Sequence, residues 1–76
     1  MVFEKIQAIL SNQFGIDTDQ ITENTDIVSD LGADSLDVVE MLMSVEDEFG
    51  IMIDDDSIAE LKTVGDVVAC IEARLD

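Results

Sequence analysis

The stretch DSLDVVEMLMSVEDEFG, residues 34–50, contains the pattern that decides the fold. Asp34 is a suitable helix N-cap, and Asp37, three residues later, imitates a capping box. Apolar residues then recur at helical spacing as far as Gly50. The stretch therefore predicts an amphipathic helix that begins at a well-defined residue.

This helix has two apolar stripes when successive residues are placed about 100° apart. The expected core positions share one face: Val38, Leu42, Val45 and Phe49. A second stripe lies roughly a third of a turn away: Leu36, Val39 and Met43. The second stripe must either widen the core or meet another protein. Acidic neighbours favour a docking face, because binding patches commonly have apolar centres and charged rims.

Helical patterns recur on both sides of this stretch. Residues 2–14 place apolar side chains three and four apart, and Gly15 is a natural left-handed stop. Residues 54–61 contain cap residues and then one or two helical turns. Thr63 and Asp66 repeat the capping pattern before a valine-rich final helix.

Residues 16–33 are rich in Asp, Thr and Asn and predict a long loop. We expect five aliphatic side chains to pin it to the core: Ile16, Ile21, Ile27, Val28 and Leu31. The whole pattern predicts an all-α fold, a small four-helix bundle with three longer helices, one short third helix and a long first loop. At 76 residues, we expect a single domain spanning 1–76.

Charge dominates the composition. Nineteen acids and three bases give a formal net charge of −16, and residues 6–61 contain fifteen of the acids and no base. Such a surface repels nucleic acid and attracts basic partners. The charge could also serve solubility alone.

The composition excludes several kinds of chemistry. Without histidine, Ser–His and Cys–His catalysis are impossible, and a single cysteine, Cys70, cannot form an internal disulfide. The acid-rich residues 54–60 lack the spacing of a calcium loop, so we expect no dedicated metal site. No uncharged apolar run approaches the ~18 residues of a membrane span. We expect a soluble, cytoplasmic protein.

Ser35 poses a separate question. Because Asp34 already suits the cap, Ser35 falls within the first helical turn with its hydroxyl free, and Gly32 and Ala33 leave the approach open. A helix N-terminus favours a phosphate, since its free N–H groups and dipole suit an anion. A serine in this position often only starts a helix, but the setting favours attachment of a phosphate-linked group.

The segment DLGADSLDVVE, residues 30–40, resembles the signature of the acyl carrier protein family, and the likeness extends over essentially the whole chain. The resemblance implies that Ser35 carries 4′-phosphopantetheine, attached by a transferase that uses coenzyme A. The terminal thiol of that arm would hold growing fatty acyl chains as thioesters. The protein would then be a discrete, non-catalytic carrier in fatty acid biosynthesis.

The resemblance also implies partners, namely a phosphopantetheinyl transferase and fatty acid synthesis enzymes with basic docking patches. The expected partner-binding residues are Asp34, Leu36, Asp37, Val39, Glu40, Met43, Glu46 and Asp47. We expect a monomer that binds no nucleic acid and does not insert into membranes. One alternative is a carrier for polyketide or specialised lipid assembly. Another, of a different class, is an unmodified acidic module that binds proteins or divalent ions.

Two further expectations follow from the resemblance. An acyl chain could fold back between the helices, where the expected lining residues are Val38, Leu42, Phe49, Ile53, Leu61 and Val67. Many family members have a proline after the short extended piece 51–53, whereas here Ile53 is followed by Asp54. The sequence therefore does not determine where the third helix starts or how rigid it is.

Overall fold

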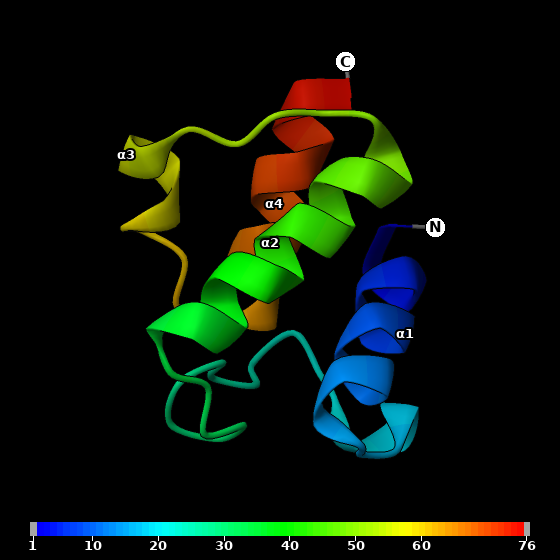
Figure 1. Cartoon of the computed structure of the whole chain (residues 1–76). Helices are drawn as coiled ribbons and strands as arrows, with labels where there is room; N and C mark the ends of the chain where they lie inside the picture. Colours follow the sequence, from blue (N-terminus) through cyan, green and yellow to red (C-terminus); the bar gives the residue numbers. More distant parts are fainter. Residues whose placement is uncertain (1, 76) are drawn as a thin grey trace.

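The computed structural model describes residues 2–75, except for the side chain of Asp55, so the predicted domain ends at 1 and 76 lie outside it. Within residues 2–75 the chain is helical in five places: α1 (Val2–Phe14), η1 (Thr18–Gln20), α2 (Ser35–Phe49), α3 (Asp55–Ile58) and α4 (Val64–Leu75). The predicted all-α bundle, with a short third helix and a long first loop, is confirmed. Helix α1 packs against both α4 and α2, and Figure 1 shows α3 on the other side of α2 from α1.

Local hydrogen bonds fix the ends of α2. The Asp34 carboxylate accepts the Asp37 backbone N–H at 2.9 Å, and the Asp37 carboxylate accepts the Asp34 N–H at 3.2 Å. At the other end, Gly50 adopts φ +65°, and its N–H donates to the Glu46 carbonyl at 2.8 Å. The predicted capping box is therefore a true reciprocal one, and it makes Ser35 the first helical residue.

The first loop is fastened to the segment before α4. The Ile27 N–H donates to the Lys62 carbonyl at 2.9 Å, and the Val64 N–H donates to the Thr25 carbonyl at 3.0 Å. Ile21 and Ile27 are buried as predicted. Val28 is 56% exposed, which contradicts the expectation that it pins the loop. The loop is thus a fixed part of the fold, but Val28 belongs to its surface.

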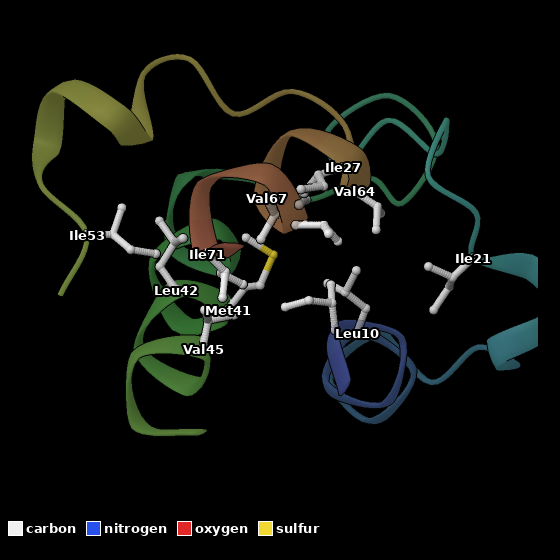
Figure 2. Packing of buried hydrophobic residues seen from close by; sticks show 13 residues of the cluster. Leu10, Ile21, Ile27, Met41, Leu42, Val45, Ile53, Val64, Val67 and Ile71 are labelled. Carbon is white, nitrogen blue, oxygen red and sulfur yellow. The ribbon is translucent and has the colours of Figure 1, made fainter. Parts of the chain in front are cut away.

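The core lies between α1, α2, α4 and the loop (Figure 2). Leu42 and Val45 are buried as predicted, whereas Val38 and Phe49 are only half-buried. Sequence analysis missed Met41, which is fully buried. Met41 lies about 60° from Val38 around α2, so the buried face extends away from the second apolar stripe.

Two methionines of α2 test this division between core and surface. Met41→Ala removes a fully buried side chain and leaves a cavity, so we expect the free energy of unfolding to fall by about 2–5 kcal/mol. Met43→Ala, the matched control at a 61% exposed position, should change it by less than about 0.5 kcal/mol. Urea denaturation measures both. Equal losses in the two variants would contradict this assignment of the core.

Helix α4 has a second capping box. The backbone N–H groups of Lys62 and Thr63 donate to the Asp66 carboxylate at 3.0 and 3.1 Å, and the Thr63 hydroxyl accepts the Asp66 N–H at 3.2 Å. These two backbone donors hold the pKa of Asp66 below its ordinary value of 3.8. The ionised carboxylate therefore stabilises the folded state.

The stability that the Asp66 cap provides depends on pH. Because the pKa of Asp66 is lower in the folded state, its stabilising effect is fully present above about pH 3.8 and disappears as the pH falls through the folded value. We expect Asp66→Asn to lower the melting temperature at pH 7 and to converge on the wild type well below pH 3.8. Thermal unfolding monitored by circular dichroism measures both curves. A constant difference across this pH range would contradict the role of the charge.

Candidate functional site

Ser35 lies at the exposed N-terminal tip of α2. The cap uses the Asp34 carboxylate and not the Ser35 hydroxyl. The first backbone bond of the helix runs from the Val38 N–H to the Asp34 carbonyl at 3.0 Å. The N–H groups of Ser35 and Leu36 therefore precede the helical ladder, at the positively polarised end of the helix dipole. Ser35, the predicted attachment residue, therefore lies where the helix dipole and the free N–H groups favour an anionic substituent.

The chain reaches this tip through a tight turn. Gly32 has φ +70°, a conformation that favours glycine, and its N–H donates to the Val28 carbonyl at 3.0 Å. Ala33 is buried, and its N–H donates to the Ile27 carbonyl at 3.3 Å. A side chain added at Gly32 would meet nothing within 4 Å, so the space before Ser35 is open.

An open apolar groove of about 520 Å³ begins at Ser35. Its lining residues come from the first loop, the start of α2, and α3 with the segment after it: Val28, Ala33, Asp34, Ser35, Val38, Val39, Ile58 and Leu61. A hydrophobic ligand attached near Ser35 would find an apolar surface within reach.

Only two of the six residues expected to line such a space, Val38 and Leu61, line this groove. Three others, Leu42, Ile53 and Val67, are buried in the core. Phe49 lies at the opposite end of α2 from Ser35. Sequence analysis missed Val28 and Ile58, because nothing local in the sequence indicates that the loop and α3 fold against the start of α2.

The second apolar stripe of α2 faces outward. Leu36, Val39 and Met43 are 64%, 49% and 61% exposed. The alternative that this stripe widens the core is therefore excluded. An exposed stripe beside acidic side chains has the composition of a docking surface.

The acids predicted to bind partners divide into two groups. Asp34 and Asp37 form the helix cap, and the Glu46 carboxylate accepts the Ile53 backbone N–H at 2.8 Å. Glu40 and Asp47 are exposed, and among the described residues their side chains have no hydrogen bond or ion pair. Sequence analysis grouped all five because an acidic residue on a helix face gives no indication of its own hydrogen-bond partner.

The ion pairs lie away from Ser35. Lys5 pairs with Glu48 at 3.5 Å and lies 5.6 Å from the centre of the Phe49 ring. Arg74 pairs with Asp54 at 3.4 Å. Among the described residues, Asp34, Asp37 and Glu40 at the start of α2 take part in no ion pair. The negative potential around the start of α2 is therefore left uncompensated within the fold.

Among the described side chains of residues 2–75, which do not include that of Asp55, no three Cys, Asp or Glu come together in a way that could hold a metal ion. None of the helices in that range has the length and apolar character needed to cross a bilayer.

Comparisons with known proteins decide the family. The model of the phosphopantetheine attachment site family matches residues 4–71. An acyl carrier protein from Thermotoga maritima is 45% identical over 74 residues, which cover 97% of this chain and 91% of that protein. One from Lactobacillus acidophilus is 47% identical over 73 residues, or 96% of this chain and 91% of that protein.

The chain belongs to the acyl carrier protein family. A solved structure of the acyl carrier protein from Enterococcus faecalis, 41% identical, superposes with a TM-score of 0.82 over 96% of this chain and 92% of that one. The prosthetic group of this family is 4′-phosphopantetheine. An exposed serine, an open approach and a neighbouring apolar groove fit such an arm. Membership in this family makes the chain a carrier protein.

Proposed function

We propose that this chain carries growing fatty acyl chains as thioesters on a 4′-phosphopantetheine arm attached to Ser35, in fatty acid biosynthesis. One observation supports this most strongly. The Ser35 hydroxyl is free of the helix cap, exposed at the polarised tip of α2, and next to an apolar groove of about 520 Å³. The helix terminus would stabilise the phosphodiester, and the groove would receive the acyl chain.

The attachment step needs an external catalyst. The chain has no histidine, and the two carboxylates nearest to Ser35 in the sequence, Asp34 and Asp37, serve the helix cap. A phosphopantetheinyl transferase would take the hydroxyl proton. The Ser35 oxygen would then bond to the phosphorus nearer the pantetheine of coenzyme A, and the adenosine bisphosphate would leave. The protein would act only as a substrate in this reaction, without catalysis of its own.

Partner enzymes would dock on α2. Exposed Leu36 and Met43 offer apolar contacts, while Glu40 and Asp47 offer charges that are not paired within the fold. Basic patches on the transferase and on fatty acid synthesis enzymes complement this surface. Charge steering gives fast association without a large buried area, which suits a carrier that must leave each partner quickly.

The groove would shelter the acyl chain between encounters. Each methylene removed from water contributes about 0.8 kcal/mol, so a chain of several carbons would favour this surface over solvent. Val38 of α2 and Leu61 after α3 both line the groove and would contact the chain.

Loading of Ser35 tests the carrier function. Incubation with coenzyme A and a broad-specificity phosphopantetheinyl transferase should increase the intact mass by one phosphopantetheine. Ser35→Ala should abolish the increase. Ser44→Ala, the matched control at another exposed serine of α2, should retain it. Loading of the Ser35→Ala variant would refute attachment at this residue.

The pathway is tested with the same loaded sample. Fatty acid elongation and reduction enzymes should extend the bound thioester by fully reduced two-carbon units, measured by mass after release of the arm. Products formed only with polyketide enzymes, which retain keto groups, would assign the carrier to the alternative pathway.

A further inference from the structure

One peptide group, between Met52 and Ile53, is held by opposite charges from two helices. Its carbonyl oxygen, on Met52, accepts a hydrogen bond from Arg74 Nε at 3.0 Å. Its N–H, on Ile53, donates to Glu46 Oε2 at 2.8 Å. We call this arrangement, Glu46 and Arg74 on the Met52–Ile53 peptide group, the peptide clamp. Charge-assisted bonds of this kind are about twice as strong as neutral ones.

The Arg74 guanidinium also binds residues at the start of α3 and on α4. Arg74 Nη2 donates to the Ser57 hydroxyl at 2.9 Å and lies 3.4 Å from the Asp54 carboxylate. Arg74 Nη1 donates to the Cys70 carbonyl at 3.3 Å and to its sulfur at 3.1 Å. Arg74 thus joins α4, the connection after α2, and the start of α3 through one planar group.

Helix α3 depends on such attachments. A helix of four residues has little stability of its own, and the main helix pairs in the fold are α1 with α4 and α1 with α2. Its N-cap is Asp54, whose carboxylate accepts the Ser57 N–H at 3.0 Å. Hydrogen bonds from Ser57, together with the charge of Arg74, hold the pKa of Asp54 below its ordinary value. Asp54 therefore remains an ionised cap and a partner for Arg74 at neutral pH.

The position of α3 determines one wall of the groove. Ile58, the last residue of α3, and Leu61, three residues later, line the groove together with Val38 and Val39 of α2. Ile53 is buried against the core at the α3 side of the cluster (Figure 2). The clamp holds the backbone at Ile53, shortly before α3 begins. The chain contains no proline that could stiffen this segment.

We propose that the peptide clamp sets the separation of α3 from α2 and thereby limits the length of acyl chain that the groove beside Ser35 admits. The clamp takes the role that a rigid backbone residue would otherwise have at the start of α3. Glu46 and Arg74 are positioning residues in this scheme, and they touch neither the arm nor its cargo. The part that concerns cargo rests on the proposed loading of Ser35.

Amide hydrogen exchange of the unloaded full-length chain tests the clamp itself. Arg74→Gln removes the hydrogen bond to the Met52 carbonyl, on the same peptide group as the Ile53 amide. The exchange rate of that amide should rise by roughly tenfold, the effect of losing one charge-assisted hydrogen bond. Lys62→Gln makes the same change in net charge outside the clamp and should leave that amide unchanged. Equal exchange in the two variants would overturn the proposal.

Glu46 provides a second pair of variants. Glu46→Gln retains an oxygen that can accept the Ile53 N–H, whereas Glu46→Ala removes it. We therefore expect faster exchange at Ile53 in Glu46→Ala than in Glu46→Gln. Identical exchange in both variants would show that the carboxylate does not hold this amide, and would overturn the proposal even if the Arg74 variant failed to fold.

Loaded samples test the limit on cargo. Acyl arms from hexanoyl to myristoyl are attached, and the methyl resonances of Ile58 and Leu61 are followed as the chain lengthens. In Lys62→Gln, which keeps the clamp, these resonances should stop changing once the acyl chain exceeds the length that the groove admits. In Arg74→Gln, they should continue to change up to a longer acyl chain. The same limit in both variants would overturn the role in cargo selection. Failure of the proposed function would appear differently, as absence of the mass increase in every variant.

Discussion

The reciprocal hydrogen bonds between Asp34 and Asp37 determine where α2 begins, and the rest of the site depends on that position. If α2 began one residue later, Ser35 would become the N-cap, and its hydroxyl would be drawn into the cap hydrogen bonds. Because the cap uses the Asp34 carboxylate, Ser35 is placed in the first turn, exposed and beside the polarised N–H groups. One local motif therefore sets both the chemistry and the geometry of the proposed attachment residue.

The acids of α2 have distinct tasks despite their similar appearance in the sequence. Asp34 and Asp37 hold the helix end, and Glu46 fixes the backbone that leads to α3. Glu40 and Asp47 have no such task within the described chain and remain available to other molecules. This division matters for mutagenesis, because removing one of the first three acids changes the fold and the surface charge together. Only substitutions of Glu40 and Asp47 change the surface charge without removing a side-chain hydrogen bond of the fold.

Sequence patterns predicted the features that depend on short-range interactions. The caps at Asp34 and Thr63, the helix lengths and the outward stripe at Leu36 all follow from residues within one or two turns of each other. The groove walls could not be predicted in this way, because Val28 and Ile58 meet α2 only after the loop and α3 fold back. The burial of Met41 was missed because the buried face of α2 is set by where α1 and α4 lie. The roles of Glu46 and Arg74 also depend on tertiary contacts, in which each meets a backbone group far from its own turn.

The most direct measurement compares the rate of phosphopantetheine transfer to two charge-reversal variants. Glu40→Lys changes a free acid on the same helix as Ser35, and Glu72→Lys makes the same change in net charge at an exposed site on α4. If an uncompensated acidic surface beside Ser35 attracts basic enzymes, Glu40→Lys should slow transfer by roughly tenfold at low ionic strength. The effect should shrink as salt screens the charges, and Glu72→Lys should remain near the wild-type rate. Equal rates in the two variants at low salt would contradict the role assigned to the α2 surface.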